Sequence, residues 1–225
     1  MTDHPAPFSR ALIPHLVEAC RGYPGGKMLD PFAGIGRGAE IADAVGMTFL
    51  GVEIEPEWAA SAIHVVHGDS TEVLPWFEPE SFDVVCTSPA YGTRMADRYL
   101  GSPKDAELGG RPRRRSYAIF LGRKPSAGSS GGMHWGQEYR DLHEKVWAEC
   151  VRLLAPGGRF VLNCSDFIAK KNLVSVTQWH ENCLVRLGLE VVDRRPIETR
   201  RFKDGQNRDA RVPHEWIISF GRPPE

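Results

Sequence analysis

The sequence lacks the features of secreted and membrane-spanning proteins, and nothing in its spacing suggests a metal centre. Among its 225 residues no apolar run approaches the roughly 20 residues of a membrane span, and residues 1–5 lack the charged and then apolar order of a signal peptide. The five cysteines are scattered without a Cys-x-x-Cys pair, which predicts reduced structural thiols and a cytoplasmic protein. No histidine has ligand spacing with a cysteine or an acid, so no metal site is expected.

The sequence also lacks an excess of charge of either sign, since its net charge is only −1. Attraction to a polyanion through overall charge is therefore excluded, although the basic residues gather locally. Residues 93–135 contain nine lysines and arginines against three acids, and residues 194–211 contain seven against three. Two such segments in a neutral protein indicate either contacts with a polyanion or two solvated loops.

Strand-like and helix-like patterns alternate along most of the chain. The expected strands are 27–29, 48–53, 62–67, 82–86, 159–164, 189–193 and 215–220. The expected helices are 9–20, capped by Ser9, and 38–45, 56–61, 73–77, 137–154 and 174–187. This alternation predicts an α/β fold with a mostly parallel sheet covered on both faces. With 41% apolar residues, we expect one domain over 1–225, in which 93–135 is an insert without periodic pattern.

Polar side chains follow four successive strands of this predicted sheet. Asp30, Glu53, Asp69 and Ser88 each come directly after, or close after, an apolar stretch. Ligands of open α/β sheets bind at the carboxyl ends of the strands, so these residues are expected to line one cleft.

The first strand end opens a glycine-rich loop over residues 30–38, DPFAGIGRG. Its glycines allow a tight turn and a close approach of backbone to a ligand, with a helix N-terminus behind. The spacing differs from G-x-G-x-x-G, which disfavours a nicotinamide enzyme. Glu53 stands about twenty residues later, where a carboxylate binds ribose hydroxyls in nucleoside-binding folds, and Asp69 could accept from an adenine amino group. The plainer interpretations are an ordinary turn and, at Glu53, a helix-capping acid.

The fourth strand leads into the short elbow Ser88-Pro89-Ala90-Tyr91. An exocyclic nitrogen of a nucleobase is a poor nucleophile because its lone pair is delocalised into the ring. It needs acceptors around its N–H groups, which the Ser88 side chain and the Pro89 carbonyl can supply, while Tyr91 can stack on the ring. No strong base is required, since neutralisation of a cationic methyl donor drives transfer and the proton leaves afterwards. A simple β-turn, with φ set by Pro89, is the alternative.

Together the two motifs resemble the DNA amino-methyltransferases, which methylate adenine N6 or cytosine N4 with S-adenosylmethionine (SAM). DPFAGIG at 30–36 resembles their cofactor motif, and SPAY at 88–91 resembles their catalytic motif, usually Asp, Asn or Ser followed by Pro-Pro-aromatic. Residues 4–9 resemble the segment that closes over the methionine part of SAM. The resemblance implies a Rossmann-like methyltransferase fold with a mostly parallel seven-stranded sheet and an antiparallel final strand, 215–220.

The resemblance also implies roles for particular residues. Its catalytic residues would be Ser88, Pro89 and Tyr91. Its cofactor-binding residues would be Phe8, Asp30, Pro31, Phe32, Ala33, Gly34, Gly36, Glu53, Asp69 and Ser88. Segment 93–135 would serve target recognition, with phosphate contacts from Arg94, Arg111, Arg113, Arg114 and Arg115 that give affinity rather than sequence reading. A target base in duplex DNA would have to be flipped out of the stack.

The sequence departs from the pattern at Ala90, which replaces the second proline and makes the turn less rigid. Serine in the first position is commoner among the cytosine-N4 enzymes. Three alternatives stay open: an RNA base N-methyltransferase, which shares the elbow; a protein glutamine methyltransferase, which usually begins it with Asn; and a SAM-binding, nucleic-acid-binding protein with little activity. Asn163, Ser165 and Asp166, after the fifth strand, are either cleft residues or turn residues.

Overall fold

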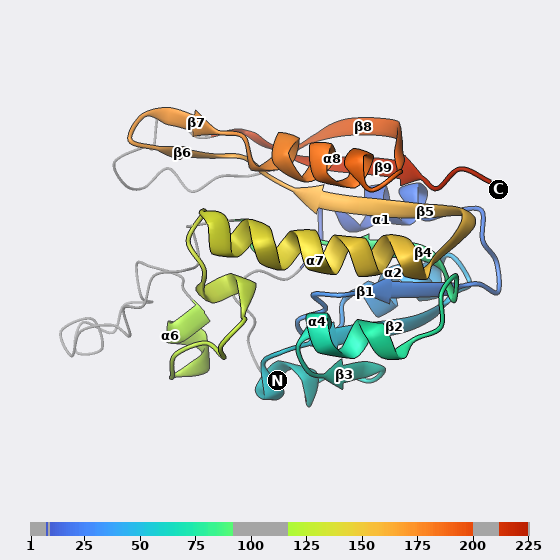
Figure 1. Cartoon of the computed structure of the whole chain (residues 1–225), viewed down its shortest axis with the longest axis horizontal. Helices are drawn as coiled ribbons and strands as arrows, with labels where there is room; N and C mark the ends of the chain where they lie inside the picture. Colours follow the sequence, from blue (N-terminus) through green and yellow to red (C-terminus); the bar gives the residue numbers. More distant parts are fainter. Residues whose placement is uncertain (1–7, 9, 92–116, 200–211, 225) are drawn as a thin grey trace.

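The computed structural model describes residues 8, 10–91, 117–199 and 212–224, which form a central sheet with helices on both faces (Figure 1). The sheet has seven strands in the order β3-β2-β1-β4-β5-β9-β8. Neighbours from β3 to β5 are parallel, whereas β9 is antiparallel to both β5 and β8. The strands are β1 Lys27–Asp30, β2 Thr48–Glu53, β3 Val65–His67, β4 Phe82–Thr87, β5 Leu154–Cys164, β8 Glu190–Glu198 and β9 His214–Gly221. The predicted fold class, including an antiparallel strand at 215–220, is confirmed.

The helices connect and cover these strands. They are α1 Ile13–Ala19, α2 Gly38–Ala44, α3 Pro56–Ala59, α4 Ser70–Val73, α6 Tyr117–Leu121, α7 Gln137–Leu153 and α8 Val176–Arg186, with short 3₁₀ segments η1 Leu74–Trp76 and η3 Ser130–Gly132. A second, two-stranded sheet pairs β6 Phe167–Ala169 with β7 Asn172–Val174.

Successive residues of the central strands pack into two different cores, which is why both faces of the sheet carry helices. Leu29 and Val85 belong to the core that contains α7 and α8. Their neighbours Met28 and Val84 belong to the core that contains α1 and α2. Because side chains of a strand alternate between faces, two apolar neighbours in sequence bury both sides of the sheet. This burial fixes the strand register and holds the carboxyl ends of β1, β2 and β4 at one edge.

Three strand boundaries differ from the sequence prediction by more than one residue. β8 continues to Glu198, through residues 194–198 that were expected to belong to the basic connecting segment. β3 begins at Val65 instead of residue 62, because His64 has a φ of 63° and interrupts the extended backbone. β5 begins at Leu154 and runs through residues 156–158, which were expected to form a break between helix and strand. Gly157, with a φ of 74°, provides the irregular backbone there without ending the pairing.

Other elements were not predicted at all. α6 and η3 lie inside segment 93–135, for which no regular structure was expected, while residues 92–116 of that segment lie outside the described residues. The β6–β7 hairpin occupies residues that were assigned to no element and part of the expected helix 174–187. The proposed cap Ser9 also lies outside the described residues, and α1 begins only at Ile13.

All five cysteines are free and buried, as the sequence predicted. Burial raises the pKa of the Cys150 thiol well above its usual range, so this side chain acts as a small apolar group in the core. Among the helices that the structure describes, none combines the length and apolarity that crossing a membrane requires.

Candidate active site

A cavity opens at the carboxyl ends of β1, β2 and β4, where the sequence placed the cleft. Nine of the predicted residues line it: Phe8, Asp30, Pro31, Phe32, Ala33, Gly34, Glu53, Asp69 and Ser88. Three do not line it, namely Gly36, Pro89 and Tyr91. The predicted phosphate-binding residues Arg94, Arg111, Arg113, Arg114 and Arg115 lie outside the described residues. The wall also contains Ala90 of the elbow and residues that the sequence did not single out: Ile35, Arg37, Val52, Ile54, Ser70, Tyr117, Gly128, Ser129, Ser130 and Leu142.

The glycine loop is held in shape by its own backbone geometry and by an acid from β2. Gly34 and Gly36 have φ values of 54° and 74°, which side-chain-bearing residues adopt only with strain. A Cβ on Gly36 would also lie 2.8 Å from the Cβ of Ala62, so both space and conformation require glycine there. The Gly34 N–H donates to Glu53 Oε2 at 2.8 Å, which ties the loop to the end of β2.

Glu53 is buried, and each of its oxygens accepts a backbone hydrogen bond. Oε2 accepts from Gly34 and Oε1 accepts from the Glu55 N–H, both at 2.8 Å. Burial raises the pKa of Glu53 to about 7, against the opposing effect of these two hydrogen bonds. A cationic ligand in the cavity would therefore favour ionisation of this carboxyl.

Asp30 ends β1 and links it to the neighbouring strand. Its Oδ1 accepts from the Thr87 hydroxyl at 2.6 Å and from the Phe32 N–H at 3.0 Å. Burial raises the pKa of Asp30 to about 6, while those hydrogen bonds act in the opposite direction. Asp30 thus places a second poorly solvated carboxyl at the bottom of the cavity.

Asp69 serves as the cap of α4 and also faces the cavity. Its Oδ1 accepts from the Thr71 N–H and hydroxyl, each at 2.8 Å. Within the part of the chain that the structure describes, its Oδ2 makes no hydrogen bond. A Cβ built on Gly128 would lie 2.7 Å from that oxygen, so only glycine fits over it without displacing the acid.

Residues from inside the predicted insert form the outer wall of the cavity. Tyr117 packs edge-on against Trp58, with ring centroids 4.9 Å apart. Glu55, whose side chain is 0% exposed, accepts from Arg123 at 2.9 Å and from the Ser126 N–H and hydroxyl, both at 2.9 Å. These contacts fasten the segment that carries Gly128, Ser129 and Ser130 to the residues following β2. No signal in the sequence predicts them, since Glu55 and Arg123 are far apart in the chain.

The elbow after β4 is held by a network that spans three strands. The Tyr91 hydroxyl donates to Glu215 Oε2 at 2.9 Å and lies 3.1 Å from Asn163 Oδ1. The Ser88 hydroxyl donates to Asn163 Oδ1 at 3.0 Å and lies 3.2 Å from the Tyr91 oxygen. Asn163 Nδ2 donates to the Trp216 carbonyl at 3.1 Å, which fixes the orientation of the amide. Asn163 therefore contacts the elbow from β5 and orients its hydroxyl groups.

Burial and the charge of Glu215 raise the pKa of Tyr91 well above its usual range, so its phenol stays protonated. Glu215 was not predicted as a site residue. It lies 124 positions from Tyr91 and reaches it only because β9 pairs with β5. Asn163, Ser165 and Asp166 do not line the cavity. Of the three, only Asn163 contacts the elbow, through Ser88 and Tyr91.

A second chain of hydrogen bonds supports the same elbow from α7 and α8. Trp147 Nε1–H donates to His180 Nδ1 at 3.0 Å, which leaves His180 Nε2–H to donate to the Tyr139 oxygen at 3.1 Å. Tyr139 O–H in turn donates to the Ala90 carbonyl at 2.8 Å. Burial lowers the pKa of His180 well below its usual range, so the ring stays neutral. With one proton on the ring, every hydrogen bond of the series donates in the direction from Trp147 to Ala90.

Comparisons with known proteins identify the fold. A family model described as a DNA methylase, N6_N4_Mtase, matches residues 2–64. No curated protein matches the sequence. A TehB-like SAM-dependent methyltransferase from Corynebacterium glutamicum is 18% identical, with 93% of this chain and 86% of that chain covered and a TM-score of 0.50. A SAM-dependent methyltransferase from Methanosarcina mazei is 11% identical, with 91% and 95% covered and a TM-score of 0.55.

A protein from Thermus thermophilus assigned as a DNA modification methylase is 21% identical over 70% of this chain, with a TM-score of 0.43. This chain spans only about half of that protein, 51% of its length. At these identities the similarities establish the fold alone, which is the fold of SAM-dependent methyltransferases.

Proposed function

We propose that this protein is a SAM-dependent methyltransferase that methylates the exocyclic amino nitrogen of a DNA base, cytosine N4 or adenine N6. The observation that carries the proposal is the position of the Ser88-Pro89-Ala90-Tyr91 elbow. It follows β4 directly, and its first residue lines the same cavity as Asp30, Glu53 and Asp69. The match of residues 2–64 to a DNA methylase family supports the choice of DNA.

The chemistry of the cavity wall fits SAM. SAM supplies an electrophilic methyl group on a positively charged sulfur. The three carboxyl side chains of Asp30, Glu53 and Asp69 are complementary to a cation, and few other charges line the cavity. Glu53 would bind the ribose hydroxyls from the end of β2, and Asp69 Oδ2, beside Gly128, would accept from the adenine amino group.

The direction of the hydrogen bonds around Ser88 suits an amino substrate. Because Ser88 donates its only proton to Asn163 Oδ1, the lone pairs of its oxygen remain to accept a hydrogen bond from a substrate N–H. That hydrogen bond favours the nucleophilic, pyramidal nitrogen. The Pro89 carbonyl would be the second acceptor, and the Tyr91 ring, fixed through its hydroxyl, would lie against the base.

No side chain at the elbow has to act as a strong base. Serine, a backbone carbonyl and a protonated tyrosine orient the amino group, and the surplus proton leaves after the methyl group has been transferred. Ala90 keeps its carbonyl bound to Tyr139, so the hydrogen bond from α7 replaces part of the rigidity that a second proline would give. Activity is therefore expected despite this departure.

The test is nucleoside mass spectrometry after incubation of the protein with isotope-labelled SAM and, separately, DNA and RNA. Label on N4-methylcytosine or N6-methyladenine from DNA is the expected result and names the base. Label found only in RNA would replace the proposal by an RNA methyltransferase. Binding of SAM with no label anywhere would leave a binding protein without activity.

The matched control is Ser88→Ala, which keeps the backbone of the elbow. It should lose most of the label even at saturating SAM, because the acceptor for the amino group is gone. Label at the wild-type level in this variant would contradict the assignment of the elbow.

A further inference from the structure

The β6–β7 hairpin extends from the edge of the molecule that carries the candidate active site. It follows the carboxyl end of β5, the strand that contributes Asn163 to the elbow, after only Ser165 and Asp166. Figure 1 shows the hairpin reaching past the central sheet on the side to which the β5 arrow points, the side where α6 also lies. Any long ligand that presented a base to the elbow would extend along this edge.

The turn of the hairpin is unusual. Ala169 pairs with Asn172, so Lys170 and Lys171 are the two turn residues, and their φ values are 48° and 67°. Two-residue hairpin turns of this kind are normally Asn-Gly or Asp-Gly, because left-handed backbone costs a lysine free energy. The sequence therefore keeps two cations at a place where folding favours other residues.

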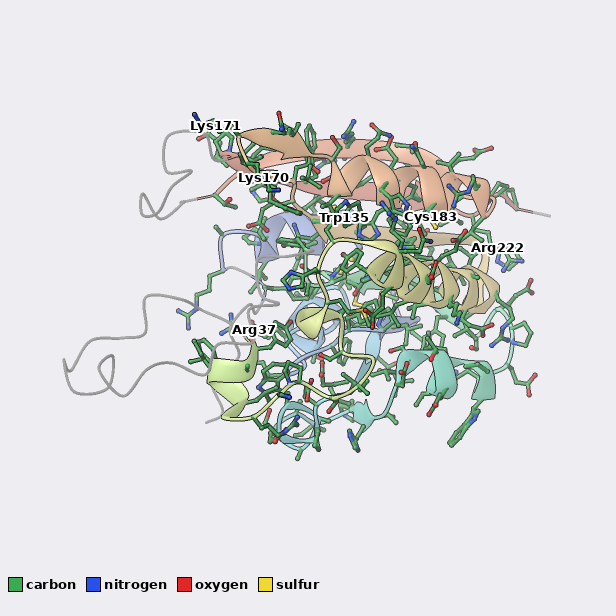
Figure 2. All side chains as sticks on the ribbon, turned by 60° about the vertical axis from the view of Figure 1, so that its left-hand side comes forward. Arg37, Trp135, Lys170, Lys171, Cys183 and Arg222 are labelled. Carbon is green, nitrogen blue, oxygen red and sulfur yellow. The ribbon has the colours of Figure 1, made fainter. Side chains whose placement is uncertain are left out.

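Both lysines are exposed, and neither forms an ion pair within the part of the chain that the structure describes. Figure 2 shows them at the outer end of the hairpin. Some basic residues elsewhere are paired with acids, for example Arg123 with Glu55 and Glu57, and Arg194 with Glu181. The hairpin segment 167–174 contains no acid. The hairpin thus carries a local positive charge that no acid of the described residues neutralises.

The base of the hairpin is fixed, so its tip has a defined position. The Ser165 hydroxyl donates to the His214 carbonyl at 3.2 Å. Asp166 Oδ1 accepts from the Thr177 N–H at 2.8 Å, which joins the hairpin to the start of α8. Ser165 and Asp166 consequently act as turn residues that hold the hairpin against β9 and α8.

We propose that the β6–β7 hairpin binds the DNA backbone beside the target base, with Lys170 and Lys171 contacting phosphates. This inference rests on the proposed function. The carboxyl groups lining the cavity suit a cationic cofactor but repel phosphates, so an incoming strand needs cations placed outside the cavity. Leu173, 57% exposed on the adjacent strand, offers an apolar surface to the sugar of the same strand.

The test exchanges the turn for its favoured sequence, in the double variant Lys170→Asn, Lys171→Gly. If the lysines serve DNA, thermal stability should rise by a few degrees while duplex binding weakens by roughly tenfold or more at about 0.1 M salt. The slope of log K against log salt should become shallower by about 1.8, as expected for two lost phosphate contacts. Binding is measured by anisotropy of a short fluorescent DNA duplex, and SAM affinity should not change.

Two further variants separate charge from shape. Lys27→Asn with Lys145→Asn removes two exposed lysines, one of them at the opposite, amino end of β1, and should leave the salt slope unchanged. Lys170→Arg with Lys171→Arg keeps the charge and should keep binding. A gain in stability with unchanged affinity and slope in the Asn-Gly variant would overturn the inference while leaving the proposed function intact. A wild-type protein that neither binds nor methylates DNA would overturn both.

Discussion

At the scale of single residues, the decisive feature is the direction of the hydrogen bond between Ser88 and Asn163. Asn163 cannot turn its amide, because Nδ2 donates to the Trp216 carbonyl, so its Oδ1 always faces the Ser88 hydroxyl. An acceptor held at a fixed place lets Ser88 present lone pairs toward the cavity. If Asn163 is lost, the Ser88 proton is free to point at the substrate and compete with its N–H groups.

We therefore predict that Asn163→Ala lowers kcat by roughly tenfold or more and leaves SAM affinity unchanged. Steady-state kinetics and calorimetry with SAM measure the two quantities. The control is a double-mutant cycle: in a Ser88→Ala background the same substitution should cost almost nothing, because its effect passes through the serine. Additive losses in the cycle would show that Asn163 acts independently of Ser88.

The raised pKa values of two buried carboxyls predict that cofactor binding depends on pH. Glu53 has a pKa of about 7 and Asp30 a pKa of about 6, both raised mainly by burial. Below these values each site carries a proton, which a cationic ligand must displace. Affinity for SAM should thus rise between about pH 5.5 and pH 8, and calorimetry across that range measures it. Glu53→Gln should weaken binding at pH 8 and flatten the curve; a wild-type affinity independent of pH would contradict the role of these acids.

At the scale of elements, α7 and α8 determine the shape of the elbow although they contribute little to the cavity wall. The series of hydrogen bonds from Trp147 through His180 and Tyr139 ends on the Ala90 carbonyl, so two helices hold one peptide group of the elbow. Trp147 Nε1–H can only donate, which fixes the direction of every later bond in the chain. The helices thus act as a rigid support for a loop that lacks the second proline.

We predict that Tyr139→Phe lowers kcat by roughly tenfold while SAM affinity stays the same. The substitution removes the donor to Ala90 and leaves a buried N–H of His180 unpaired, which should also cost about 1–3 kcal/mol of stability. Denaturant unfolding, kinetics and SAM titration measure the three effects. If the variant loses stability but keeps its kcat, the tyrosine is only a structural residue.

Tyr23→Phe is the matched control for this prediction. The Tyr23 hydroxyl also donates to a backbone carbonyl, that of Gly157, at 2.8 Å, but both residues lie far from the elbow. Its removal should leave both kcat and SAM affinity at their wild-type values, since no catalytic group depends on it. An equal loss of kcat in both variants would attribute the effect to general destabilisation.

At the scale of the whole molecule, the sequence predicts what depends on local pattern. Pairs such as Met28 with Leu29 and Val84 with Val85 are apolar on both faces, which indicates a buried parallel strand before any contact is known. The strand ends then place Asp30, Glu53, Asp69 and Ser88 at one edge by topology alone. This reasoning predicted the position of the cavity and four of the residues that line it. The other five predicted lining residues, Phe8, Pro31, Phe32, Ala33 and Gly34, were expected from the family resemblance.

The contacts that the sequence could not predict join residues far apart in the chain. Glu215 reaches Tyr91 only because β9 is inserted between β5 and β8. No local sequence pattern predicts this strand order. Arg123 reaches Glu55 from inside a segment without periodicity. The β6–β7 hairpin was missed for a different reason: its turn is Lys-Lys, so the Asn-Gly signal that reveals hairpins is absent. A hairpin whose turn departs from the usual Asn-Gly or Asp-Gly preference is therefore not recognised from its sequence.

The buried acid Glu53, for which we propose a role in cofactor binding, should make the free protein less stable at neutral pH. The pKa of Glu53 rises from 4.5 in the unfolded chain to about 7 in the fold, so the folded state binds the proton more tightly. Its contribution is therefore fully present below about pH 4.5 and is lost as pH rises through 7, by a total of about 3 kcal/mol. Glutamine at this position carries no such proton.

Glu53→Gln should consequently become more stable relative to wild type as pH rises from 4.5 to 8, even though it binds SAM less well. The difference between the two proteins is informative because other titrating groups, such as the buried His143 with its pKa lowered to about 4, are common to both and cancel. Urea unfolding without SAM, at several pH values, measures this difference. A difference that stays constant across the range would mean that the pKa of Glu53 is the same in the folded and the unfolded protein, which would contradict this prediction.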